Sequence, residues 1–477
     1  MTPPASAAAT SATTARDLTP PAPSSFDDKI HEALFRKNLS REHGFEPLRV
    51  EGTLPQELKG TLFRAGPGLF ELFGRPYTHL FESDGAISAV KLDDGKAYGA
   101  TRIIESEGLK QERARKKMLY GFNVSFVRRL RNAWGQKMKN TGNTNVINHQ
   151  GRVYALMEAA KPTELSPDDL TTIGETDMGG VIPGAFSAHP HYVKSRDTLY
   201  NFGLRYGRQT KIDLYAMPAK GATTRIGSVP LKHPVMLHDF ICTDNHMVFF
   251  VSPVRMKLFN VLTQIGGFKD MFEWTPDAGT EVIVVPIDRP QEVTRFHTEA
   301  FFQWHFSNAF ERDGELVVDY ARYPNFDSFE ALETSAIPSG QFYRGVIDTK
   351  RRILRSEPLS GLGCEFPRVH PNREGSDYRY SWMMATQPHG VSRLDVQTGE
   401  DLTYEFPDGE YSSEPVFVAT GDDELDGYVL SLVYDVNADL SYLAVFDANK
   451  LTAGPIARAW FDQRIPITFH GNWMDQA

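Results

Sequence analysis

The sequence has few cysteines and no long hydrophobic run. Its 477 residues include two cysteines, Cys242 and Cys364, so a disulfide framework is excluded and both thiols are expected to be buried and inert in a reducing cytosol. No stretch approaches the roughly 18 apolar residues of a membrane span. The net charge of −10 argues against general binding to nucleic acid, so no nucleic-acid partner is expected.

No secretory leader is expected from the first residues. Residues 1–25 are rich in Ala, Ser, Thr and Pro and hold neither a basic start nor an apolar central segment. This composition is typical of a disordered tail rather than of a signal peptide. We therefore predict a cytoplasmic protein, with peripheral membrane contact as an open alternative, and expect residues 26–477 to form one domain.

The chain does contain a long series of short strand patterns. A helical segment is expected at about 26–40, and the β-rich part should start near Phe45. From there, apolar and β-branched runs alternate with Asp-Gly, Gly-Asp-Asp and Asn-Arg-Glu-Gly turn signals. The clearest runs are 151–158, 281–288, 314–320, 427–435 and 441–448. Strands that recur in this way from 60 to 470 predict an all-β propeller, although no strict repeat is visible.

Two insertions, at about 105–142 and 253–275, interrupt the strand pattern. Residues 112–139 hold nine basic residues and one acid among aromatic and apolar side chains. Residues 253–274 are predicted to form a helix with one apolar face, which consists of Val254, Leu258, Val261, Leu262 and Ile265. Both patterns fit peripheral contact with an anionic membrane surface. They fit equally well ordinary helices that pack over one face of the propeller.

Four histidines each lie inside a short apolar run: His189, His238, His305 and His470. Their gaps of 49, 67 and 165 residues exclude one helix as their common support. The innermost strands of a propeller meet at its axis, so the gaps are consistent with one ligand from each of several blades. Four neutral imidazoles would bind a redox-active metal such as iron. Taken singly, each histidine is more often a hydrogen-bonded core residue.

Three glutamates lie in equally apolar surroundings: Glu158, Glu365 and Glu414. A buried carboxylate is costly unless it is paired, and a metal-bound imidazole needs an acceptor for its second N–H. The glutamates are therefore candidates for orienting the histidines. The alternative is that they pair with arginines such as Arg368 or cap turns.

Six short motifs, in order, resemble the carotenoid cleavage oxygenase family, which includes stilbenoid dioxygenases and a retinoid isomerase. They are Ala-His-Pro, His-Asp-Phe, His-x-x-Asn-Ala-Phe-Glu, Glu-Phe-Pro-Arg, Ser-Glu-Pro-x-Phe and Phe-His-Gly-x-Trp. The segment Gly-Thr-Leu-Phe-Arg-Ala-Gly-Pro-Gly at 60–68 is similar to the family's early Arg-x-Gly-Pro. The resemblance spans about residues 45–475.

The resemblance implies a seven-bladed propeller with a helical and loop cap over the metal-bearing face, and one Fe(II) per chain. It implies His189, His238, His305 and His470 as iron ligands. It also implies that three of these histidines are oriented by the carboxylates of Glu158, Glu365 and Glu414. No further catalytic residue is expected, because O2 is the co-substrate and the protein positions and shields the reactants. Candidates for the wall of a substrate tunnel are Phe126, Trp134, Phe259, Phe268, Phe302, Trp304, Phe306 and Trp473.

Departures from the family pattern bear on the substrate. The stilbenoid branch tends to have Lys before the first glutamate and Tyr after the Arg of the strand at 100–104, where this chain has Met157 and Ile103. Both changes favour a hydrophobic carotenoid or apocarotenoid, cleaved at a C=C bond into two carbonyl products. A stilbenoid dioxygenase, a family isomerase and a non-enzymatic propeller that binds partners stay open. A zinc hydrolase fits poorly, since its sites usually carry three protein ligands.

Overall fold

The structure is a computed structural model that describes residues 18–22, 24–135, 138–263, 265–331 and 334–476. Most of the predicted tail, residues 1–17 and 23, lies outside this range. Ser24–Ser25, the end of that tail, forms β1 and pairs with β25 (Ala336–Ile337). The helical segment expected at 26–40 is α1 (Asp28–Phe35), whose start is capped by the Asp27 carboxylate.

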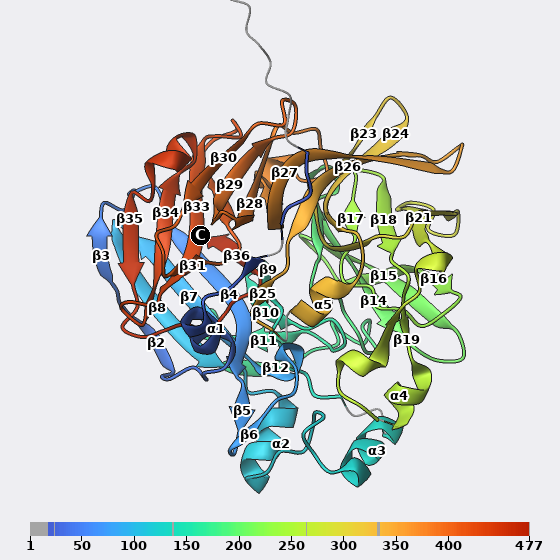
Figure 1. Ribbon diagram of the computed structural model, residues 1–477, viewed down its shortest axis with the longest axis horizontal. Helices are drawn as coiled ribbons and strands as arrows, with labels where there is room; N and C mark the ends of the chain where they lie inside the picture. The colour runs from blue at the N-terminus through green and yellow to red at the C-terminus, as the bar shows by residue number, and fades with distance from the viewer. Residues whose placement is uncertain (1–17, 23, 136–137, 264, 332–333, 477) are drawn as a thin grey trace, which may run out of the picture.

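Blades of four to six antiparallel strands stand side by side around the molecule (Figure 1). Blade 1 contains β36 (Gly471–Asp475), β4 (Gly60–Leu69), β7 (Asp84–Asp93), β8 (Lys96–Ile103) and β2 (His43–Pro47). Blade 2 contains β9 (Asn145–His149), β10 (Arg152–Leu156), β11 (Thr163–Leu165) and β12 (Thr172–Glu175). Blade 3 contains β13 (His191–Val193), β14 (Thr198–Arg205), β15 (Thr210–Pro218) and β16 (Thr224–Leu231).

Blade 4 contains β17 (Ile241–Cys242), β18 (His246–Val251), β21 (Thr280–Pro286) and β22 (Thr294–Thr298). Blade 5 contains β23 (Phe302–Arg312), β24 (Glu315–Tyr323), β26 (Gly340–Asp348) and the first part of β27 (Ile353–Val369). Blade 6 contains the second part of β27, β28 (Tyr380–Gln387), β29 (His389–Asp395) and β30 (Asp401–Glu405). Blade 7 contains β31 (Glu410–Ser412), β32 (Val416–Ala419), β33 (Gly427–Asp435), β34 (Leu440–Asp447), β35 (Ala457–Trp460) and β3 (Arg49–Gly52).

The long strand β27 joins two blades that form one continuous sheet. Its residues 353–358 pair with β26 of blade 5, and residues 365–369 pair with β28 of blade 6. The register shifts between Glu365 and Arg368, where Phe366 has a φ of 54°. A β-bulge of this kind bends a strand and redirects its side chains, so β27 can serve as the outer strand of one blade and the inner strand of the next.

The strands alternate their side chains between the two neighbouring blades, and this closes the ring. In β18, Phe249 packs in a cluster with blade 3, whereas the next residue, Phe250, packs in a cluster with blade 5. Apolar clusters of this kind fill the interfaces between successive blades, and one of them joins blade 7 to blade 1. The chain ends close the ring as well, since β36 pairs with β4 and β3 pairs with β35. The predicted all-β propeller is confirmed.

The inner strands β36, β9, β13, β23, β27 and β32 line a central channel of about 810 Å³. Away from the blades, the two insertions lie at one end of the molecule, where α3 and α4 are neighbours (Figure 1). The first insertion holds α2 (Glu107–Arg115) and α3 (Phe126–Trp134). The second holds α4 (Leu258–Thr263). Within the described residues, no helix is long and apolar enough to cross a membrane.

The single helical face predicted for 253–274 is wrong. Val254 lies in β19 (Val254–Met256), which pairs with β20 (Phe272–Trp274), and α4 occupies only the turn between them. The helix is short because Gly266 and Gly267 follow it, and Gly266 has a left-handed φ of 85°. The side chain of Leu262 lies outside the described residues.

Candidate metal centre

The four histidines named from the sequence meet at the axis of the propeller. Three of them lie just before the innermost strand of their blade: His470 in blade 1, His189 in blade 3 and His238 in blade 4. His305 lies within β23, the innermost strand of blade 5. One nitrogen of each lies within 4.8 Å of the others. All four residues are buried, with 5% to 8% of their surface exposed. Only the propeller brings these distant segments together.

Carboxylates fix the orientation of three of the four imidazoles. Nδ1 of His238 contacts the carboxylate of Glu158. Nδ1 of His305 lies 2.6 Å from Glu365, and Nδ1 of His470 lies 2.9 Å from Glu414. Donation of Nδ1–H to a carboxylate leaves a lone pair on Nε2. These glutamates come from blades 2, 6 and 7, so every blade contributes one histidine or one glutamate to the centre.

The arrangement of the nitrogen atoms fits a bound cation. The Nε2 atoms of His238 and His305 lie 3.2 Å apart, although neither carries a hydrogen to share when its Nδ1–H is donated to a glutamate. The Nε2 of His189 is buried and has no hydrogen-bond partner among the described residues. A metal ion would satisfy all three lone pairs, and a buried polar atom without a partner is otherwise costly.

Two of the four histidines, His189 and His470, are held in the neutral form that a metal requires. Burial lowers the pKa of His189 well below its ordinary value, and the nearby His238 and His470 lower it further. Burial likewise lowers the pKa of His470 to about 4, although Glu414 opposes this shift. Both rings therefore present lone pairs at neutral pH.

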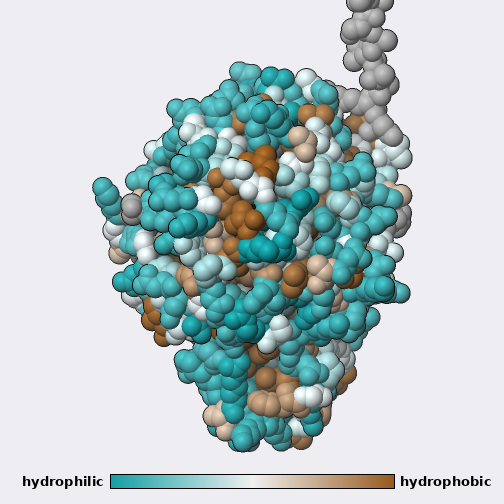
Figure 2. Space-filling model, turned by 90° about the vertical axis from the view of Figure 1, so that its left-hand side faces the viewer, coloured by the Kyte–Doolittle hydropathy of each residue, from teal (hydrophilic) through white to brown (hydrophobic). Residues whose placement is uncertain are grey.

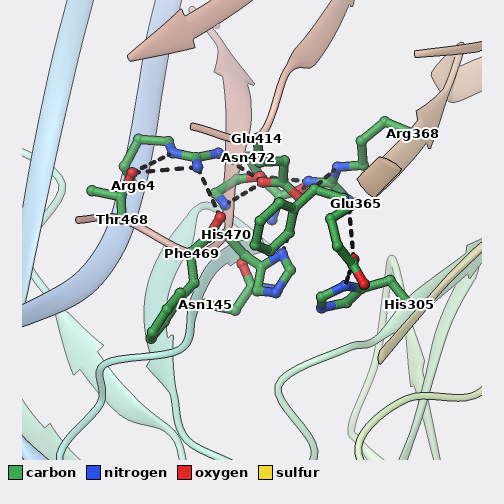
Figure 3. Close-up of polar contacts among 12 residues, drawn as sticks. Arg64, Asn145, His305, Glu365, Arg368, Glu414, Thr468, Phe469, His470 and Asn472 are labelled. Carbon is green, nitrogen blue, oxygen red and sulfur yellow. Dashed lines mark hydrogen bonds and ion pairs between the residues drawn. The ribbon is translucent and has the colours of Figure 1, made fainter. Parts of the chain in front are cut away.

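Glu414 is held more tightly than the other two glutamates. It accepts a hydrogen bond from Nη1 of Arg64 at 2.7 Å, and Nε of Arg368 lies 3.3 Å from its other oxygen (Figure 3). Burial alone would raise the pKa of the Glu414 carboxyl, but Arg368, His470 and Arg64 together hold it below its ordinary value. Glu414 therefore both orients a histidine and pairs with arginines, which the sequence had offered as alternatives.

The other two carboxylates have different surroundings. Glu365 is 3% exposed, and its second oxygen accepts a hydrogen bond from the Tyr323 hydroxyl. The side chain of Glu158 is 29% exposed, and no cation pairs with it among the described residues. The three contacts therefore differ in how far water screens them.

Two polar residues that the sequence analysis did not single out connect the ligand-bearing segments. Asp239 accepts N–H bonds from Phe240 at 2.7 Å and Phe306 at 2.9 Å, and it contacts Nε2 of His191 at 3.2 Å. Asn145 donates to the backbone carbonyl of Ala188 at 2.6 Å. Asp239 belongs to the His-Asp-Phe motif, so its position beside His238 was the available signal.

Aromatic rings cover the centre. The ring centroid of Trp304 lies 4.9 Å from that of His238 in an edge-to-face contact. Phe366 lies 4.9 Å from His305 and 5.1 Å from His470. Its left-handed backbone costs a bulky residue about 1 to 3 kcal/mol, which the β-bulge in β27 accommodates. The sequence analysis quoted Phe366 within Glu-Phe-Pro-Arg but assigned it no role.

The candidate tunnel residues separate into several groups. Phe302 and Trp304 pack in one aromatic cluster, with Phe268 against it. Phe306 packs between blades 4 and 5, and Trp473 packs against the cluster between blades 7 and 1 and lines the central channel. Three others are exposed on α3 and α4: Phe126, Trp134 and Phe259. The structure therefore places the first group beside the metal centre and the last at the surface.

The end of the molecule that carries α3 and α4 exposes several large hydrophobic side chains. Trp134 is 79% exposed and Phe259 is 67% exposed. Val127, Met138, Leu258 and Ile265 are exposed nearby in the sequence. Hydrophobic atoms also appear at this lower end of the molecule in Figure 2.

Both cysteines, Cys242 and Cys364, are free and buried, as predicted.

Comparisons with known proteins match nearly the whole chain. The family model of retinal pigment epithelial membrane protein matches residues 37–475. Apocarotenoid-15,15'-oxygenase of Synechocystis is 29% identical over 453 residues, which cover 89% of this chain and 92% of that protein. Isoeugenol monooxygenase of Pseudomonas putida is 25% identical over 463 residues, covering 90% and 94%. The structure of cobalt-substituted Synechocystis apocarotenoid oxygenase superposes with a TM-score of 0.86 at 26% identity, covering 94% of this chain and 98% of that one.

Proposed function

The chain belongs to the family of retinal pigment epithelial membrane protein, that of the carotenoid cleavage oxygenases, and we propose that it is a non-haem iron dioxygenase. Its substrate is a carotenoid or apocarotenoid, in which one C=C bond is replaced by two C=O groups with both atoms of O2. The observation that carries the proposal is the convergence of four buried histidines, within 4.8 Å, on one point.

His189, His238, His305 and His470 would hold the metal. Imidazole suits iron, zinc, copper and nickel alike, so the choice of Fe(II) rests on the family. When bound, the ferrous ion supplies the electron density that activates O2. The reaction consumes no external reductant, because the two oxygen atoms account for both new carbonyl groups.

The protein itself orients and shields the reactants. Glu158, Glu365 and Glu414 hold three imidazoles with Nε2 toward the metal. Trp304 and Phe366 cover the centre with apolar surface, which excludes water and suits an alkene that does not itself bind the metal. No side chain has to donate or remove a proton in a reaction that makes two carbonyls from one alkene.

The direct test is incubation of iron-loaded protein with an apocarotenal, a carotenoid, a hydroxystilbene and isoeugenol, followed by mass analysis of the products in 18O2. We expect labelled aldehydes or ketones from the carotenoid class. Cleavage restricted to the phenolic substrates would favour the alternative that the similarity to isoeugenol monooxygenase raises. Unlabelled rearranged products would indicate an isomerase, and absence of both iron and products would indicate a binding protein.

We also propose that α3 and α4 contact a membrane from which the substrate is taken. The exposed side chains Trp134 and Phe259 suit the interface region, and the exposed Arg131 on α3 suits anionic headgroups. The test is flotation with anionic vesicles. The double variant Trp134→Glu/Phe259→Glu should lose binding, whereas the control Ile353→Glu, at a residue that is 45% exposed on β27, should retain it. Equal binding by all three proteins would refute the contact.

A further inference from the structure

His79 is a buried histidine within the aromatic wall beside the metal centre. It immediately precedes η1 (Leu80–Glu82) and is 3% exposed. Its ring stacks on Phe268 at a centroid distance of 4.7 Å and on Phe329, in α5 (Asp327–Ala331), at 5.0 Å. Phe81 lies 5.0 Å away in a tilted contact. The ring is thus enclosed by segments from three different parts of the chain.

The hydrogen bonds of His79 define which nitrogen carries its proton. Nδ1 accepts the backbone N–H of Phe81 at 3.1 Å, so the lone pair is on Nδ1. Burial lowers the pKa of His79 to about 3, so the ring is neutral and its one proton is on Nε2. This Nε2–H has no acceptor among the described residues. A buried donor without a partner costs about 1 to 3 kcal/mol.

A continuous path of ring contacts leads from His79 to the metal centre. Phe81 lies 6.3 Å from Trp304 and 5.9 Å from Phe469, both edge to face. Trp304 contacts His238, and Phe469 directly precedes His470. The indole N–H of Trp304 is already donated to Ser328 at 2.9 Å. His79 therefore adds a donor in need of an acceptor to a wall that is otherwise aromatic.

We propose that Nε2–H of His79 donates a hydrogen bond to an oxygen atom of the substrate, and that the enzyme thereby selects a polyene with a carbonyl or hydroxyl group. This inference rests on the proposed function and specifies its substrate class. A carboxylate is disfavoured, because the ring is neutral and a buried anion would lack a counter-charge. A single water is a poorer partner, since it needs two to four polar contacts and the surrounding rings supply none.

Two substitutions of His79 separate the two nitrogens. In His79→Asn the amide oxygen can still accept the Phe81 N–H, but no group reaches the position of Nε2. In His79→Gln the amide NH2 reaches that position. The substrates are an apocarotenal and the hydrocarbon polyene of the same length. For His79→Asn we expect kcat/KM for the apocarotenal to fall about 5- to 150-fold, mainly through KM, because one acceptor is left unpaired. The hydrocarbon should be cleaved as before, and His79→Gln should recover part of the loss.

His389 provides a matched control in blade 6. Its Nε2 accepts the backbone N–H of Ser412 at 2.9 Å, and its buried Nδ1 has no partner among the described residues. Its ring stacks on Tyr411 at 4.2 Å, and burial lowers its pKa to about 3. It has no ring contact with Phe81, Trp304 or the metal ligands. His389→Gln should leave the ratio of kcat/KM for the two substrates unchanged.

The inference would be overturned if His79→Asn lowered kcat/KM for both substrates by the same factor, or left their ratio as in the wild type. Binding of the same two polyenes, followed by quenching of tryptophan fluorescence, separates this result from a failure of the proposed function. If the wild-type protein cleaves neither polyene, but His79→Asn alone loses the preference for the apocarotenal in binding, the hydrogen bond stands and the dioxygenase assignment fails.

Discussion

Replacement of each glutamate by glutamine tests how the protein orients its metal ligands. In Glu365→Gln the shape is kept, and the amide oxygen can still accept Nδ1–H of His305, but the charge is lost. A hydrogen bond to a charged group is worth about 1.5 to 3 kcal/mol and a neutral one about 1 kcal/mol. The expected loss of about 1 to 2 kcal/mol corresponds to iron binding that is about 5- to 30-fold weaker.

The surroundings of the three carboxylates predict a graded result. Glu158, whose side chain is 29% exposed, should matter least, because water screens its charge. Glu414→Gln should weaken iron binding and also destabilise the metal-free protein by about 3 to 5 kcal/mol, because the buried Arg64 loses its counter-charge. Glu365→Gln should leave the metal-free protein nearly as stable as the wild type, since Glu365 pairs with no arginine among the described residues.

The assay combines competition for iron by a chelator with denaturant unfolding of the metal-free proteins. Competition gives the relative iron affinity of each variant, and unfolding gives the change in stability without the metal. The reasoning would be refuted by equal iron loss from all three variants. It would also be refuted if Glu365→Gln retained iron as tightly as the wild type.

Three further predictions concern other residues. Lys139→Met should lower the free energy of unfolding by about 3 to 5 kcal/mol, because Lys139 contacts the buried carboxylates of Asp84 and Glu112 at 2.6 Å each; unchanged denaturant unfolding would contradict this. Burial lowers the pKa of His389 in the folded protein to about 3, below the ordinary 6.5. Its contribution to the free energy of unfolding is therefore complete above pH 6.5 and is lost as the pH falls from 6.5 through 3, by up to about 1.4 kcal/mol per pH unit. His389→Gln should therefore show a weaker loss of stability between pH 6.5 and 4 in unfolding titrations, and an identical slope would show that folding does not lower the pKa of His389. His305→Ala should abolish stoichiometric iron and activity together, and full iron occupancy by metal analysis would remove His305 from the ligand set.

The sequence predicted those features that short runs of residues determine. Alternation in segments such as 427–435 and 441–448 corresponds to β33 and β34, because apolar side chains two residues apart face the same side of a strand. The histidines were recognisable because each lies in an apolar run, where a buried imidazole is costly unless it has a hydrogen-bond partner or binds a metal. Their meeting point required only that inner strands converge.

Features that depend on contacts between distant segments could not be read from the sequence. Arg64 and Glu414 are 350 residues apart, and no local pattern pairs them. The bulge at Phe366 depends on the register of β27 against two neighbours. For 253–274, the 3.6-residue spacing of apolar side chains indicated a helix, but pairing of β19 with β20 decided the structure at both ends of the segment.

The most direct test of the metal centre is X-ray absorption at the iron edge of the purified, iron-loaded protein. The account predicts one iron per chain with a first shell of nitrogen and oxygen atoms, and outer-shell scattering that requires four imidazole rings. A sulfur neighbour, or a spectrum that is fitted by two or fewer imidazoles together with a bound carboxylate, would contradict it.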